Sequence, residues 1–172
     1  MKNTLRTILG LIALAFISSA SAKEKFYPEQ DPALKYDLPS GWSAKDHGDA
    51  TIITSKSGRV TVNFTAVPKD ASMAVYQEQF AAEKKNQGWQ GIKVIMEPKK
   101  ETNEGLTSFS GIYEAKGEGV DSKSTFEFTL MLFNGGKGQS ILCNLTVDTP
   151  KSLSDADKNA YDTLMASMKA HK

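Results

Sequence analysis

Residues 126–148, FEFTLMLFNGGKGQSILCNLTVD, decide the fold. In the first half apolar residues occupy every second position, which predicts a strand whose one face carries Phe126, Phe128, Leu130 and Leu132. Asn134-Gly135 is the strongest short hairpin signal in the chain. The alternation then returns, with a second apolar face made of Ile141, Cys143, Leu145 and Val147. This stretch therefore predicts two antiparallel strands joined by a tight turn.

Further strands precede this hairpin. Strands predicted at 92–97 and 106–115 are separated by a polar turn, and a loop from Lys116 leads to the hairpin. Sequential strands with short loops are typical of an antiparallel meander. Earlier in the chain, an extended segment beginning at Tyr36 reaches a Pro-Ser-Gly turn at 39–41, where Gly41 allows a tight reversal, and Trp42 starts the next strand, which predicts hairpin strands. Further strands are predicted at 50–54 and 59–67.

Two segments instead repeat with a helical period of about 3.6 residues. The first is predicted to begin at Asp70 or Ser72 and to end at Gly88. The second begins near Ser152 or Ser154, after Pro150. Its broad apolar stripe consists of Leu153, Ala156, Ala160, Tyr161, Leu164, Met165 and Met168. Methionines at this spacing can form an adaptable binding groove, but core packing is their more frequent use, and we favour it.

Each helix has one apolar stripe to bury, so helices covering an antiparallel sheet are the natural arrangement. We therefore predict an α+β fold in which an antiparallel β-sheet is flanked by helices. The expected organisation is a signal peptide at 1–22, a polar N-terminal arm at 23–33, and a single domain at 34–172. Periodicity does not determine which helix covers which face.

The first 22 residues predict export. Lys2 and Arg6 supply a positive start, and residues 8–17 are apolar apart from Gly10. The small residues that follow end in Ala20-Ser21-Ala22, the pattern accepted by signal peptidase, so cleavage after Ala22 is expected. The apolar run is about half the roughly 20 residues that a membrane span needs. No cysteine lies near the cleavage site, which argues against a lipid anchor.

The mature chain is expected to be soluble and nearly neutral. The full sequence has 21 basic and 20 acidic residues, and cleavage removes two of the basic ones, leaving a net charge of about −1. This balance gives no electrostatic case for nucleic acid or an anionic membrane surface. No second segment predicts a membrane span. The expected location is the periplasm or, after release, the extracellular medium.

The single cysteine, Cys143, cannot form an internal disulfide. An intermolecular disulfide and a nucleophile are its two functional interpretations. Its position on the apolar face of a predicted strand favours a third, in which Cys143 is a small buried apolar residue.

The chain resembles the PsbP-like family, which includes bacterial DcrB-type envelope proteins. The resemblance rests on residues 38–42, LPSGW, on the helix segment 72–80, SMAVYQEQF, and on 91–95, GIKVI, followed by the meander and a last helix. It covers roughly residues 34–170. It implies an α/β/α sandwich around an antiparallel sheet, with roles in binding or assembly rather than catalysis. No partner of the family transfers to this chain residue by residue.

The residues that could carry catalytic or metal chemistry all have structural explanations. His47, between Asp46 and Asp49, could suggest a metal site or a base held by a carboxylate, but its segment is typical of a turn. His171 lies next to the C-terminus, where fraying is expected. The glycine-rich residues 134–140 lead into a strand, unlike a phosphate-binding loop. Other candidates also have structural explanations: the acid pairs Glu101/Glu104 and Asp155/Asp157, the tryptophans Trp42 and Trp89, and the glycosylation sequons at Asn63 and Asn144.

We therefore predict no catalytic, metal or cofactor residue and assign no binding residue. The expected function is that of an exported, soluble, non-enzymatic protein-binding or assembly module of the bacterial envelope, whose partner is another envelope protein. The alternative is a periplasmic small-molecule or lipid-binding protein, with the ligand lodged between helix and sheet. A hydrolase with unusual catalytic residues is a third, less favoured hypothesis.

Overall fold

The computed structural model describes residues 22–29, 33–103, 106–117, 124–134, 139–148 and 153–171. The expected signal peptide and cleavage site thus lie almost wholly outside the described residues. The elements are, in chain order, β1 (Lys23–Tyr27), β2 (Leu34–Leu38), β3 (Ser43–His47), β4 (Ala50–Thr54), β5 (Val60–Pro68), α1 (Met73–Asn86), β6 (Gln90–Asn103), β7 (Leu106–Gly117), β8 (Ser124–Asn134), β9 (Gln139–Asp148), α2 (Asp155–Ser167) and β10 (Lys169–Ala170).

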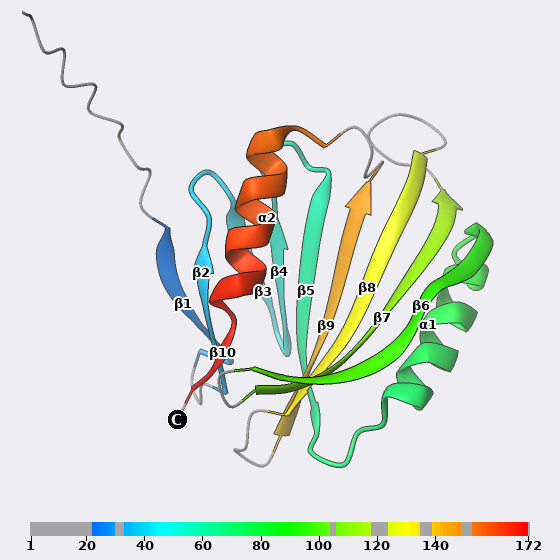
Figure 1. The fold of residues 1–172 in the computed structure, drawn as a ribbon, viewed down its shortest axis with the longest axis horizontal. Coiled ribbons are helices and arrows are strands. Elements are labelled where there is room, and N and C mark those ends of the chain that lie inside the picture. The colour runs from blue at the N-terminus through cyan, green and yellow to red at the C-terminus, as the bar shows by residue number, and fades with distance from the viewer. Residues whose placement is uncertain are drawn as a thin grey trace, which may run out of the picture.

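The main sheet is antiparallel, with strand order β3-β4-β5-β9-β8-β7-β6 (Figure 1). Strands β6 to β9 are neighbours in chain order, which confirms the predicted meander. The last strand of the meander, β9, pairs with β5 from Val60↔Val147 to Pro68↔Gln139. The protein therefore has the predicted α+β composition, with mostly antiparallel sheet and two helices.

A second, three-stranded sheet has the order β1-β2-β10. Its first strand lies within the segment that the sequence suggested was an arm preceding the domain. The structure differs because Tyr27 is buried in the core and β1 pairs with β2 along its whole length. The turn at Gly41, where φ is +79°, therefore leads from one sheet to the other rather than closing a hairpin.

The helices begin and end close to their predicted limits. Helix α1 follows Ser72, and Gly88 closes it with a φ of +82°, while the Trp89 N–H donates to the Lys84 carbonyl at 2.9 Å. Helix α2 is capped by Ser154, whose hydroxyl accepts a hydrogen bond from the Asp157 N–H at 3.1 Å.

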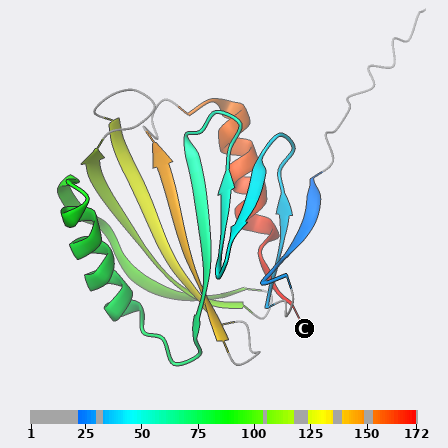
Figure 2. The same ribbon diagram turned by 180° about the vertical axis from the view of Figure 1, so that it is seen from behind.

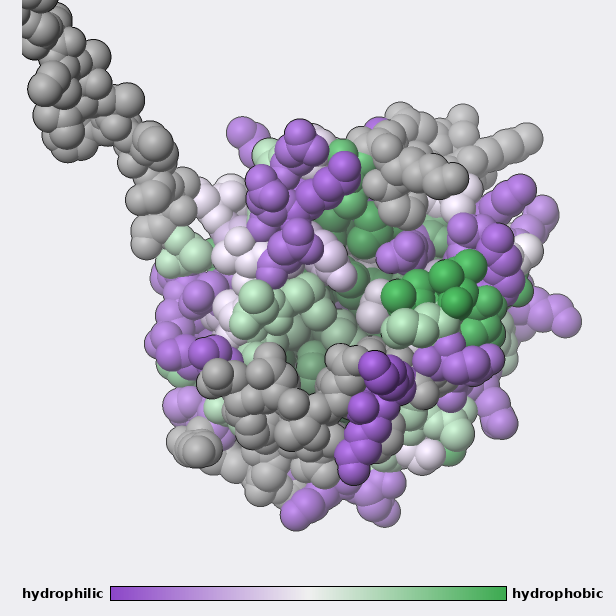
Figure 3. Space-filling model, viewed as in Figure 1, coloured by the Kyte–Doolittle hydropathy of each residue, from purple (hydrophilic) through white to green (hydrophobic). Residues whose placement is uncertain are grey.

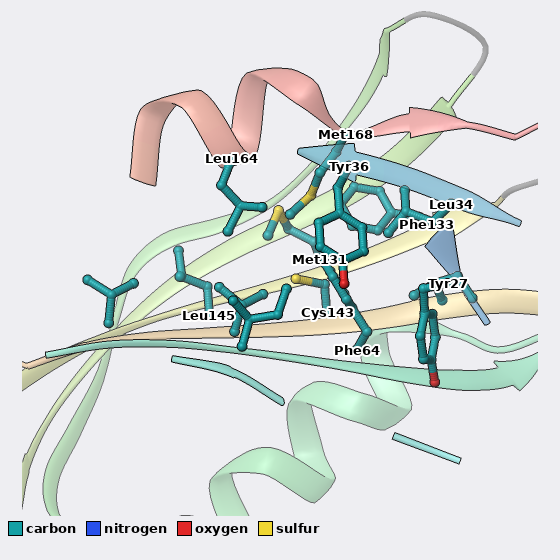
Figure 4. Packing of buried hydrophobic residues seen from close by; sticks show 14 of the residues in the cluster. Tyr27, Leu34, Tyr36, Phe64, Met131, Phe133, Cys143, Leu145, Leu164 and Met168 are labelled. Atoms are coloured by element: carbon teal, nitrogen blue, oxygen red, sulfur yellow. The ribbon is translucent and has the colours of Figure 1, made fainter. Parts of the chain in front are cut away.

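The two helices pack on opposite faces of the main sheet. Side chains of α2 join a core cluster with Val62, Phe64 and Cys143, whereas α1 packs on Phe128 and other residues of the reverse face. Helix α2 lies in front of the sheet in Figure 1 and behind it in Figure 2. Figure 4 shows the α2 cluster, in which Cys143 of β9 has Phe64 of β5 and Met131 of β8 as its cross-strand neighbours.

Candidate binding surfaces

Cys143 is completely buried, as predicted. Burial also raises the pKa of its thiol, so the thiolate needed for nucleophilic or metal-binding chemistry is disfavoured. Its surroundings are those of a core residue.

The two histidines do not form part of a metal-binding group. His47 is exposed at the end of β3, beside the turn at Gly48. His171, where fraying was expected, stacks edge-on against Phe26 at 5.0 Å between ring centroids, and its N–H donates to the Ala33 carbonyl at 3.0 Å. Within the described ranges, no group of three or more His, Cys, Asp or Glu residues could hold a metal ion.

Both tryptophans have structural roles. Trp42 is buried in the α2 cluster. Trp89 meets Phe126 and Phe128 edge-to-face, with centroid distances of 4.6 and 5.2 Å, so it packs onto the sheet. Asp155 and Asp157 lie in the first turn of α2, as predicted. Glu104 and residues 135–138 lie outside the described residues, as does the side chain of Glu101.

The chain's own lysine covers the aromatic cluster beside Trp89. The Lys84 ammonium lies 5.5 Å from the ring centroid of Phe80, 5.3 Å from that of Trp89 and 5.0 Å from that of Phe128. Burial lowers the pKa of the Lys84 ammonium, and the negative charge of Glu83 partly offsets this shift by raising the pKa. Because the chain supplies this cation itself, the cluster is not an open site for a foreign one.

A cavity of about 240 Å³ lies between α1 and the main sheet. Its walls come from three strands and the helix: Asn63, Thr65, Tyr76, Gln79, Phe80, Glu83, Leu130, Leu142 and Asn144. The two asparagines are direct cross-strand neighbours in β5 and β9. This is where the sequence hypothesis of a ligand between helix and sheet would place a small molecule.

The side-chain oxygens of Asn63 and Asn144 are buried and accept no hydrogen bond. A buried oxygen of this kind lowers the stability of the fold, because its hydrogen bonds with water are lost on folding and no others replace them. Sequence reasoning considered both residues only as glycosylation sequons and correctly placed them in strands. What it missed is the register that brings the two Asn-x-Thr segments together.

A second cavity, of about 290 Å³, borders β1 and β3. Two of its polar side chains are already paired, since the Thr51 hydroxyl donates to Asp46 at 2.5 Å and Glu24 forms an ion pair with Lys35. None of its described lining residues has a buried, unpartnered polar atom. It therefore offers less evidence for a ligand than the cavity under α1.

Strand β6 forms one edge of the main sheet and exposes three consecutive apolar residues. Val94, Ile95 and Met96 are 48%, 53% and 38% exposed. Figure 3 shows apolar surface gathered over β6. The pairing of β6 with β7 is irregular here, with register shifts on both sides of Met96. We call these three residues the β6 apolar edge.

Comparison of the chain with protein-family models and with curated proteins gives no match. Among the helices of the described part of the chain, none is long and apolar enough to cross a membrane.

Proposed function

We propose that this protein is an exported, non-enzymatic binding or assembly module of the bacterial envelope, which binds an extended segment of another envelope protein along the β6 apolar edge. The observation that carries the proposal is the exposure of Val94, Ile95 and Met96 on an edge strand. Consecutive apolar residues are costly to expose, and an edge strand offers backbone groups to which another strand can pair.

The sequence supports the location and the fold in this proposal. The positive start, apolar run and Ala20-Ser21-Ala22 motif favour export to the periplasm with cleavage after Ala22. The PsbP-like α/β/α sandwich is supported by helices on opposite sheet faces and by the LPSGW segment at 38–42. N-terminal sequencing of exported protein should begin at Lys23, and a retained Met1 would contradict export.

A comparative pull-down from envelope extract tests the binding surface. Ile95→Lys places a charge at the centre of the β6 apolar edge, and should reduce recovery of the partner by about tenfold or more, as for a central contact residue. The matched control is Val75→Lys, which makes the same change at a helix residue of similar exposure, 49% against 53%. Equal recovery with both variants, or no reproducible partner, would contradict the proposal.

The cavity under α1 supports a second candidate function, the binding of a small molecule. The observation that favours it is the pair of buried, unpartnered amide oxygens among its lining residues. A buried polar group without a hydrogen bond destabilises the fold, so such groups are expected where a ligand or water supplies the missing hydrogen bond. The amides also favour a polar ligand over a lipid chain, which would leave them without hydrogen bonds.

A further inference from the structure

The cavity under α1 has an unusual balance of side-chain chemistry. Five of its described lining residues carry neutral groups that donate and accept hydrogen bonds: the amides of Asn63, Gln79 and Asn144 and the hydroxyls of Thr65 and Tyr76. Glu83 supplies the one carboxylate among these described lining residues, and it already accepts a hydrogen bond from Gln87 at 2.8 Å. The described lining contains no lysine, arginine or histidine.

We propose that this cavity binds a neutral, hydroxyl-rich ligand the size of one sugar ring. The proposal rests on the second candidate function and names its ligand class. An anionic ligand would meet Glu83 with no cation in the described lining to balance it. A hydroxyl group, in contrast, donates and accepts, so it can pair with either end of each amide.

The remaining lining suits the apolar faces of a sugar ring. Tyr76 and Phe80 contribute aromatic rings from α1, while Leu130 and Leu142 contribute aliphatic surface from the sheet. Ligand sites commonly combine such apolar walls with a few polar groups that fix orientation. At about 240 Å³ the cavity also exceeds the roughly 150 Å³ that suffices for benzene. A ring with hydroxyl substituents therefore has room.

The thermal stability of an Asn144 variant distinguishes a structural role of the Asn63 and Asn144 pair from a binding role. Its amide oxygens are buried without partners, so these residues do not stabilise the fold through hydrogen bonds at those atoms. Replacing Asn144 by leucine should remove this cost. We expect Asn144→Leu to raise Tm by about 2–4 °C, the shift typical of a modest gain in a domain of this size.

NMR titration of the ¹⁵N-labelled chain tests the ligand class. The neutral probes are glucose and N-acetylglucosamine at millimolar concentration, and the charged probes with the same ring stereochemistry are glucosamine and glucuronate. We expect at least one neutral sugar to shift amide signals of α1 and of β5 and β9 near Asn63 and Asn144, and to bind at least about tenfold more tightly than glucuronate, which Glu83 repels. Asn144→Leu should lose these shifts, whereas Val75→Lys, which lies outside the lining, should retain them.

Three results would overturn the proposal, and they have different consequences. Equal or tighter binding of a charged probe in this cavity would contradict the ligand class but retain the second candidate function. Absence of shifts with every probe would count against both. A lower Tm for Asn144→Leu would show that Asn144 has a structural role.

Discussion

At the scale of single residues, the Tyr27 hydroxyl connects the small sheet to the main sheet. It donates to the Asp49 carbonyl at 2.5 Å and accepts from the Ala66 N–H at 3.0 Å. The ring itself is buried and packs beside Phe64, 5.6 Å away between centroids. One side chain of β1 thus pairs with a backbone carbonyl of the turn between β3 and β4 and with a backbone N–H of β5.

Tyr27→Phe should therefore destabilise the protein. It leaves the aromatic packing in place but removes the partner of two backbone groups, which we expect to cost about 1–3 kcal/mol. Urea unfolding measures this difference. Tyr76→Phe is the control, because the Tyr76 hydroxyl has no hydrogen bond to another described residue, and an equal loss of stability in both variants would contradict this role of Tyr27.

Residue-level predictions from the sequence succeeded where a residue's own strand determines its environment. Cys143 follows the alternation of its strand, and its burial was predicted. The pairing of Asn63 with Asn144 depends instead on the register between β5 and β9, which are separated by a helix and three strands. Local periodicity carries no information about such long-range pairing.

At the scale of elements, the end of α1 is held against the sheet by Trp89, whose ring lies directly over Gly117 of β7. A Cβ atom at Gly117 would lie 2.5 Å from two ring carbons of Trp89. The ring cannot easily move away, because it packs edge-to-face on Phe126 and Phe128. The glycine thus leaves the space that the tryptophan fills.

Gly117→Ala should lower stability by about 1–3 kcal/mol, the usual cost of overpacking a well-filled site. Because the clash involves Trp89, the intrinsic fluorescence of the folded variant should also change. Gly58→Ala is the comparison for the fluorescence: its positive φ of +76° strains an alanine and should lower stability, but the added methyl group meets open space, so the tryptophan spectrum should not change. An unchanged spectrum and stability in Gly117→Ala would show that Trp89 does not pack over this position.

The sequence predicted the presence of the helices and most strands better than it predicted the lengths of the strands and the strands with which they pair. The period-two segments and Asn134-Gly135 sufficed for the meander. Strand β6 was predicted at 92–97 but spans Gln90–Asn103, because pairing with β7 extends it through a polar segment. The small sheet was not predicted, since it joins β2 to β10 from the far end of the chain.

At the scale of the whole molecule, the main sheet divides the core into two clusters, and one helix covers each of them. The larger cluster, under α2, buries the hydroxyl-bearing rings of Tyr36 and, in part, Tyr161. Burial raises the pKa of both groups from 10 to about 12. Nearby acids contribute in the same direction, Asp46 for Tyr36 and Glu127 for Tyr161.

These shifts predict alkaline unfolding. Above pH 10 the unfolded chain loses tyrosine protons that the folded chain retains, so stability should fall as the pH rises from about 10 to about 12. The urea midpoint measured across this range should decline less steeply in Tyr36→Phe than in the wild-type protein. Parallel declines in the two proteins would contradict the contribution of Tyr36.

The β6 apolar edge carries the proposed function, and photo-crosslinking in cells that express the full chain tests it most directly. A photoreactive amino acid replaces Ile95 in one variant and Val75, an exposed apolar residue of α1, in the other. We predict a discrete covalent adduct with one envelope protein from position 95 and none from position 75. No adduct from position 95, or the same adducts from both positions, would contradict the account.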